Sequence, residues 1–74
     1  MTREEFCAVL KDELAEKTDI TPETNFKNLD SYGSLSSVLV LQLIEDRLGV
    51  QLNPRNFRKI QTVNDIFDEA AQAG

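Results

Sequence analysis

The sequence predicts an all-α protein: a four-helix bundle with three main helices, a short third helix and a long first loop. Three observations lead to this prediction. Apolar residues recur at helical spacing near both ends of the chain, an apolar run in the middle is too long for an ordinary strand, and turn-forming residues separate these segments. The 74 residues suffice for one small domain with a thin core, so we expect a single domain over residues 1–74.

The first helix is predicted to begin after Thr2 and to end near Lys17-Thr18. Thr2 and Glu5 have the spacing of a capping box, in which each side chain accepts a hydrogen bond from a backbone N–H group at the helix start. The apolar residues behind this box recur at helical spacing and form one stripe: Phe6, Val9, Leu10 and Leu14.

The segment from Thr18 to Gly33 shows no such period. Ile20, Phe26 and Leu29 are isolated apolar residues that can pin a long loop across the helices. A loop of this length without structure of its own is unusual in so small a domain and is typical of functional segments. The alternative is a plain connector between antiparallel helices.

The most apolar stretch runs from Leu35 to Leu48, and Gly49 follows it where a helix favours a left-handed residue. We predict a helix of about four turns here. Four of its residues form an arc wide enough to pack against the bundle: Val38, Leu41, Ile44 and Leu48. A second apolar row consists of Leu35, Leu39 and Leu43. This row is either covered inside a small bundle or, in part, faces solvent as a docking strip for other proteins.

Two further helices are predicted after Gly49. Asn53-Pro54 is a cap and first-turn pair, so Pro54 to Lys59 is expected to be a short helix with Phe57 turned inward. Thr62 is the expected N-cap of the last helix, and Asp65 lies in its first turn, where an acid meets the positive end of the helix dipole. The inner stripe of this helix consists of Val63, Ile66, Phe67 and Ala70.

The composition excludes several classes of function. Histidine is absent, which removes the commonest general base and most zinc sites, so we expect neither catalytic residues nor a metal site. The formal net charge of −5 argues against nucleic acid and favours partners with basic docking surfaces.

The sequence also predicts where the protein works. Its single cysteine, Cys7, cannot form an internal disulfide and suits a reducing compartment. The first residues are acidic where a signal peptide needs basic and apolar ones, and no apolar run approaches the length of a membrane span. We therefore expect a cytoplasmic protein that does not insert into membranes.

Ser34 is the one candidate for chemistry. It follows Gly33 at the start of the central helix, in a loop that must lie at the surface. Its hydroxyl either caps the helix or stands free, where the N–H groups of the helix end would stabilise an attached phosphate ester. Because the chain has no base to activate Ser34, another enzyme would have to modify it.

The order of these features resembles the acyl carrier protein and peptidyl carrier protein family. The resemblance rests on the capped first helix, the long loop, the stretch Leu29-Asp30-Ser31-Tyr32-Gly33-Ser34-Leu35, the apolar helix ending in Leu48-Gly49-Val50, the short third helix, and Thr62-Val63 followed by Asp65-Ile66. It spans nearly the whole chain. In that family the serine of an Asp-Ser-Leu motif opens the second helix and receives 4′-phosphopantetheine from a dedicated transferase.

The resemblance implies a discrete acyl or aminoacyl carrier without catalysis of its own. Coenzyme A would donate the 4′-phosphopantetheine arm to Ser34, and the arm would hold the cargo as a thioester. The expected partners are the phosphopantetheinyl transferase and acyl-loading and condensing or transferring enzymes of a specialised fatty-acid, polyketide or non-ribosomal-type pathway, with the carrier a monomer. The residues expected to dock partners are Leu35, Leu39, Gln42, Leu43, Glu45 and Asp46.

Two features depart from the family pattern. Gly33 stands where the motif has its aspartate, so a charge beside the serine is missing. The second helix is poor in acids compared with carriers that serve fatty-acid synthesis, and the third helix is basic, with Arg55, Arg58 and Lys59. The departures leave an alternative open: an unmodified helical interaction module that binds one protein through Leu35, Leu39 and Leu43.

Overall fold

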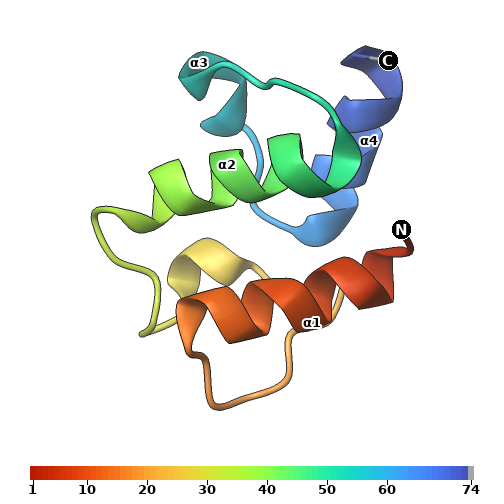
Figure 1. Cartoon of the computed structure of the whole chain (residues 1–74). Helices are drawn as coiled ribbons and strands as arrows, with labels where there is room; N and C mark the ends of the chain where they lie inside the picture. Colours follow the sequence, from red (N-terminus) through yellow and green to blue (C-terminus); the bar gives the residue numbers. More distant parts are fainter. Residues whose placement is uncertain (74) are drawn as a thin grey trace.

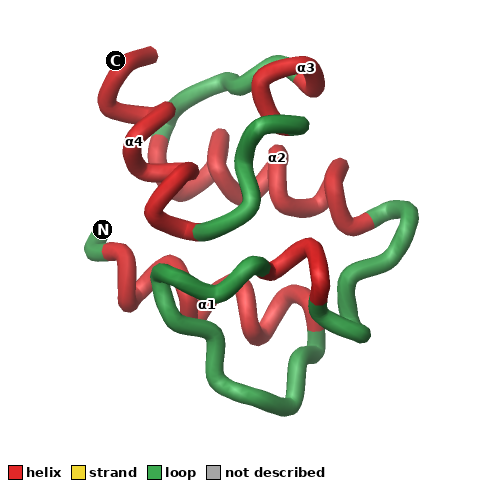
Figure 2. The backbone as a smooth tube through the Cα atoms, turned by 180° about the vertical axis from the view of Figure 1, so that it is seen from behind, coloured by secondary structure: helices red, strands yellow, loops and turns green. Residues whose placement is uncertain are grey.

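Two antiparallel helices, α1 (Arg3–Leu14) and α2 (Ser36–Leu48), lie side by side and form the body of the protein (Figures 1 and 2). The structure is a computed structural model, and it describes residues 1–73. Over that range the remaining elements are a 3-10 turn η1 (Phe26–Asn28), the short α3 (Pro54–Phe57) and α4 (Val63–Ala73), which packs against α1, and no strand occurs. The predicted all-α architecture with a short third helix and a long first loop is confirmed.

The core lies where α1, α2, α4 and the first loop meet. Eight of its side chains are fully buried: Phe6, Leu10, Phe26, Val40, Ile44, Ile60, Val63 and Ile66. No polar or charged side chain is buried among the described residues. Burying an aliphatic or aromatic side chain contributes about 1.5–3 kcal/mol, so this small apolar cluster holds the fold together.

The start of α1 follows the prediction, but its end does not. The hydroxyl of Thr2 accepts the N–H of Glu5 at 3.1 Å, and the Glu5 carboxylate accepts the N–H of Thr2 at 2.8 Å. The helix ends at Leu14, before the predicted Lys17, because Ala15 adopts a left-handed conformation (φ 54°). The Ala15 N–H donates to Asp12 O, and the next N–H donates to Lys11 O, which closes the helix end.

The first loop is anchored as predicted. Ile20 and Phe26 are buried and Leu29 is half-buried against the core. Two backbone bonds tie the loop to the region around α4, because the Phe26 N–H donates to Gln61 O and the Asn64 N–H donates to Pro22 O, both at 3.1 Å. Figure 2 shows the loop crossing α1 on the side turned away from the viewer in Figure 1.

The buried face of α2 differs from the predicted one. Val40, Leu43 and Ile44 face the core, whereas Val38, which was expected to do so, is 67% exposed. Leu43, which was expected in the docking row, is only 6% exposed. The correction has a simple cause: α2 is apolar nearly all round, so its period cannot select the face that the rest of the bundle covers.

The last two helices begin as predicted. The Asn53 side chain accepts the N–H of Asn56 at 2.7 Å, and Phe57 points into the core at the end of α3, which stops short of the predicted Lys59. The Thr62 hydroxyl accepts the N–H of Asp65, whose carboxylate accepts the N–H of Thr62 in return. The predicted inner stripe of α4 is fully buried at Val63 and Ile66 and half-buried at Phe67 and Ala70. Within residues 1–73 no helix is both long and apolar enough to cross a membrane.

Candidate functional site

Ser34 lies in the turn that leads into α2, at the left edge of Figure 1. The N–H of Ser36 donates to Gly33 O at 3.1 Å and closes this turn, so α2 begins two residues after Ser34. Ser34 is exposed, and its hydroxyl makes no hydrogen bond within residues 1–73. The N-cap position is held by Leu35, which has no side-chain acceptor. Of the two alternatives for Ser34, the capping role is therefore wrong, and its oxygen is free for other chemistry.

The neighbouring serines are in different situations. The Ser36 hydroxyl accepts the N–H of Gly33 at 2.8 Å and is half-buried. Ser37 is also half-buried and lines a hollow between α2 and α3. Of the three hydroxyls on this segment, only that of Ser34 is both exposed and without a partner in the part of the chain described.

The N-terminus of α2 is electrostatically positive, and no side chain of its own first turn neutralises it. Its first turn contains no acidic residue, and no side chain caps it. The N–H groups of Ser37 and Val38 have no acceptor among the described residues. Unsatisfied N–H groups and the helix dipole together favour an anion at this end, by about 0.3–1 kcal/mol at an exposed position.

Contacts from other elements hold the segment that precedes Ser34. The Ser31 hydroxyl donates to the carboxylate of Glu16, just beyond α1, and the Thr18 hydroxyl donates to the other oxygen of that carboxylate. These hydrogen bonds, first the one from Ser31, lower the pKa of Glu16 below its ordinary value. On the other side of the segment the Tyr32 ring packs against Phe26 with centroids 5.9 Å apart, and burial raises the pKa of Tyr32.

Glu16 and Ser31 were not singled out from the sequence. They are separated by 15 residues and have no helical or motif spacing, so their pairing follows only from the path of the loop. Together with Tyr32 they position the turn that presents Ser34.

Gly33 is not required by the backbone conformation. It is exposed, it does not adopt a left-handed conformation, and a Cβ atom added to it would meet no atom within 4 Å. The position can therefore hold the aspartate of the family motif without a clash.

The residues expected to dock partners divide into two groups. Leu35 (79% exposed), Gln42, Glu45 and Asp46 are exposed, and Leu39 is half-buried. Leu43 is only 6% exposed and belongs to the core, although it also lines the hollow beside Leu35 and Leu39, so its docking role stays a prediction. The exposed Val38, which was expected in the core, lies on the surface instead.

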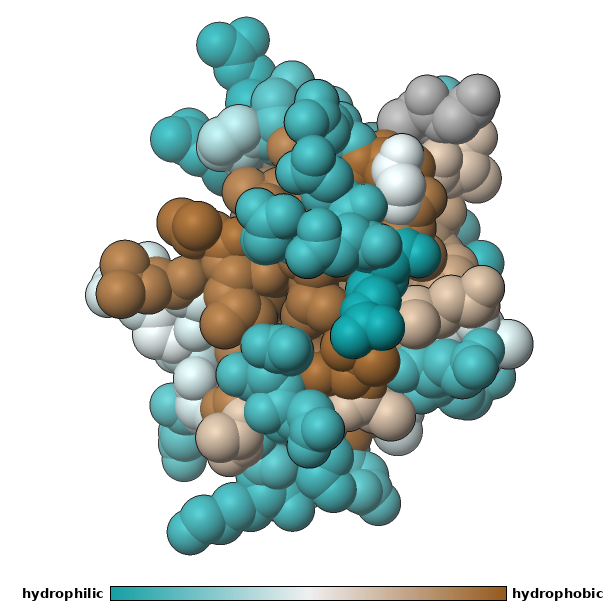
Figure 3. All heavy atoms as spheres, viewed as in Figure 1, coloured by the Kyte–Doolittle hydropathy of each residue, from teal (hydrophilic) through white to brown (hydrophobic). Residues whose placement is uncertain are grey.

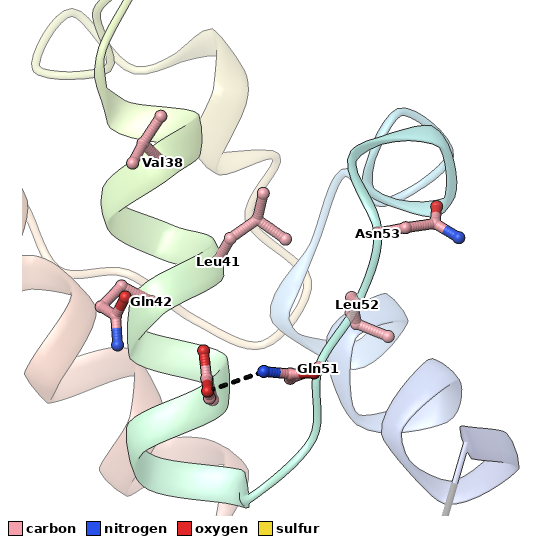
Figure 4. A pocket seen from close by; sticks show the side chains of 7 residues that line it. Val38, Leu41, Gln42, Gln51, Leu52 and Asn53 are labelled. Carbon is pink, nitrogen blue, oxygen red and sulfur yellow. Dashed lines mark hydrogen bonds between the residues drawn. The ribbon is translucent and has the colours of Figure 1, made fainter.

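The exposed acids of α2 are held by neighbouring amides. The Gln51 side chain donates to Glu45 at 3.0 Å, the bond drawn in Figure 4, and the Gln42 side chain donates to Asp46 at 3.0 Å. Figure 4 shows Leu41 on α2 and Leu52 on the following loop, two of the residues that line the hollow between these segments. Figure 3 shows a continuous apolar surface over the exposed side of α2, with polar margins above and below it.

Fold and site together define a small helical protein that presents one free serine hydroxyl at a positive helix end. The family model described as "Phosphopantetheine attachment site" matches residues 3–69, and the chain belongs to this family of carrier proteins. Members of the family are non-catalytic carriers that hold a covalently attached 4′-phosphopantetheine, and this chain is a carrier that binds that group. No solved structure matches the chain.

Proposed function

We propose that Ser34 is the attachment residue and that the chain, as one carrier domain over residues 1–74, carries acyl or aminoacyl cargo on its arm. One observation supports this most directly: the Ser34 hydroxyl is exposed and without a partner next to the uncapped N-terminus of α2, whereas the Ser36 hydroxyl is occupied by the N–H of Gly33. The Ser34 hydroxyl is therefore more accessible to a modifying enzyme than the Ser36 hydroxyl.

In the attachment step, the Ser34 oxygen forms a bond to the phosphorus that carries the pantetheine in coenzyme A. The pyrophosphate bond breaks, and adenosine 3′,5′-bisphosphate leaves with the electron pair. The hydroxyl proton passes to a base on the transferase, because this chain has no histidine to accept it. The free N–H groups of Ser37 and Val38 lie at the helix end that favours the negative phosphodiester.

The arm supplies a thiol that holds the cargo as a thioester. The protein's own residues fix the base of the arm and leave the rest of it mobile. Glu16, Ser31 and Tyr32 hold the turn, and a tethered group then reaches each partner's active site at a high effective concentration.

The partners in this proposal are the phosphopantetheinyl transferase and the enzymes that load, condense or transfer the cargo, all in the cytoplasm, with the carrier a monomer. The pathway is a specialised one, of fatty-acid, polyketide or non-ribosomal type. The exposed side of α2 supports this, because it carries only two acids, Glu45 and Asp46, and both accept hydrogen bonds from glutamine side chains.

Intact mass after incubation with coenzyme A and a broad-specificity transferase tests the proposal. We expect one added phosphopantetheine on the wild-type chain and on Ser36→Ala, and none on Ser34→Ala. Ser36→Ala is the matched control, because it removes a hydroxyl two residues away. No addition to the wild type, or addition that survives Ser34→Ala, would refute the assignment of Ser34.

A second candidate function is an unmodified interaction module. The observation that favours it is the exposure of Leu35 and Val38, large apolar side chains that no part of the described chain covers. The same mass experiment separates the two functions, because an interaction module needs no arm.

A further inference from the structure

Val38 is the meeting point of three hollows on the surface of α2. The first runs along α2 toward α1 and is lined by Leu35, Leu39 and Glu13 as well. The second lies between α2 and the segment before α3. The third lies between α2, α3 and the first loop. Val38 borders all three hollows and is 67% exposed. Together with Leu35, which is 79% exposed, it forms a protruding apolar surface that we call the ridge.

The side of this ridge that faces α3 is positively charged. Arg55, Arg58 and Lys59 lie in or just after α3 and are exposed. Within residues 1–73 the ion pairs are Arg3–Asp68 and Lys11–Asp19, so none of these three cations has an acidic partner there. Arg58 lines the third hollow together with Val38, which places one cation at the border of the ridge.

We propose that the ridge of Leu35 and Val38 docks on an enzyme surface that has an apolar depression bordered, on the α3 side, by carboxylates. This proposal rests on the proposed function, because it names the kind of partner that a carrier with Ser34 next to this ridge meets. An acidic border on the partner differs from what the net charge of −5 predicts, because an acidic protein attracts basic partners over long range.

Local charge prevails over net charge at contact distance. Exposed charges separated by more than about 8 Å are largely screened at physiological salt, so the acids on distant parts of the surface act weakly on a docked partner. The two acids of α2, Glu45 and Asp46, already accept hydrogen bonds from Gln51 and Gln42. On the α3 side of the ridge, the cations after Asn53 have no acidic partner in the described chain, whereas the hollow on the α1 side is lined by charges of both signs, Glu13, Asp46 and Arg47.

Two other binding partners, a second copy of the chain and a membrane, fit the ridge less well. A second copy of the chain on this ridge would cover Leu35, which adjoins Ser34, and would obstruct the hydroxyl that has to be modified. An anionic membrane would attract Arg58, but the first hollow on the opposite side of the ridge is lined by two acids, Glu13 and Asp46, against one cation, Arg47, and would be repelled. A partner protein can match the two sides separately.

The test uses two synthetic helical peptides with the same leucine face, one bordered by glutamates and the other by lysines. Each is titrated into the isotope-labelled, unmodified full chain, and amide chemical shifts are followed. We expect the glutamate peptide to bind more tightly, with the largest shifts at Leu35, Val38 and Arg58. Arg58→Glu should weaken it by about two- to fivefold, the range expected for one exposed ion pair. Val38→Thr, which keeps the shape of this exposed side chain, should weaken both peptides.

Lys17→Glu is the control, since it changes the net charge equally at an exposed residue that lines none of the three hollows. Equal or tighter binding of the lysine peptide, shifts on another face, or no binding of either peptide would overturn the proposal. It would equally be overturned by self-association that Val38→Thr abolishes, or by binding to phosphatidylglycerol vesicles without binding to the peptides. The titration does not need the arm, so labelling of Ser34 with a failed titration refutes the docking partner alone. A successful titration without labelling refutes the carrier assignment alone.

Discussion

The carboxylate of Glu16 accepts a hydrogen bond from the hydroxyl of Ser31, across the gap between the end of α1 and the turn that presents Ser34. The same carboxylate accepts the hydroxyl and the N–H of Thr18 with its other oxygen. One side chain therefore ties together three points of the first loop. Because these bonds favour the ionised carboxylate, the pKa of Glu16 lies below its ordinary value.

This bond predicts how stability depends on pH. A carboxylate whose pKa is lowered in the folded state stabilises the protein above its unfolded value, here 4.5, and this contribution is lost as the pH falls through the lower, folded pKa. Glu5 and Asp19 have lowered pKa values too, because of the hydrogen bonds from Thr2 and Lys11 respectively. We expect the free energy of unfolding to decrease below pH 4.5, and Glu16→Gln to decrease less steeply than the wild type.

Urea unfolding between neutral and acidic pH measures this dependence. Glu13→Gln is the control, because Glu13 is exposed on α1 and makes no hydrogen bond or ion pair within residues 1–73. Parallel pH profiles for the wild type and Glu16→Gln would show that the Glu16 carboxylate does not contribute in this way.

Ala15 is the residue at which a substitution should stabilise the protein. It has a left-handed conformation (φ 54°, ψ 40°), which costs a residue with a Cβ atom about 1–2 kcal/mol and costs glycine almost nothing. Glycine also gains freedom in the unfolded chain, which offsets part of this. We expect Ala15→Gly to raise the free energy of unfolding by about 0.5–1 kcal/mol, measured by urea or thermal unfolding.

Ala8→Gly provides the matched control for that experiment. Ala8 is exposed within α1, where glycine costs about 1 kcal/mol relative to alanine. The two substitutions should therefore shift the unfolding transition in opposite directions. A loss of stability in both would mean that Ala15 does not close the helix in the manner described.

The two ends of α1 illustrate what the sequence can predict and what it cannot. The start of α1 was predicted because Thr2 and Glu5 satisfy each other locally, and the start of α4 because Thr62 caps it. The end of α1 was placed too late because an alanine in a left-handed conformation carries no sequence signal, whereas Gly49 does at the end of α2.

The candidate site was predictable to a similar extent. Ser34 could be proposed from its neighbours in the chain, and its exposure is a local property of the turn. Which face of α2 is buried could not be predicted, because Val38 and Val40 are the same residue type two positions apart. Only the packing of α1 and the other elements decides that Val40 is buried. The bond from Ser31 to Glu16 was unpredictable for the same reason.

Gly33→Asp should speed the modification of Ser34. The substitution restores the charge of the family motif beside the uncapped end of α2, where an acid is worth about 0.3–1 kcal/mol, and a side chain at this position meets open space. We expect a higher initial rate of phosphopantetheine transfer and a modest gain in stability. Gly33→Asn is the neutral control of nearly the same shape. Equal rates for the wild type and Gly33→Asp would contradict the prediction, and a gain shared by Gly33→Asn would assign the effect to capping and not to charge.

Lys27 links the first loop to α3, and we expect this link to stabilise the protein. Its ammonium group donates to Phe57 O at 2.7 Å, at the carbonyl end of α3, and lies 4.3 Å from the centroid of the Phe57 ring. Lys27→Met keeps the length and apolar stem of the side chain but removes the donor and the charge. We expect a loss of about 1 kcal/mol in the free energy of unfolding, from the hydrogen bond and the cation–π contact together, and faster amide exchange in α3. Lys17→Met, at an exposed residue, should leave both unchanged. If Lys27→Met and Lys17→Met unfold alike, the loop and α3 are held together by Phe26 and Phe57, whose ring centroids lie 6.3 Å apart, and not by the lysine.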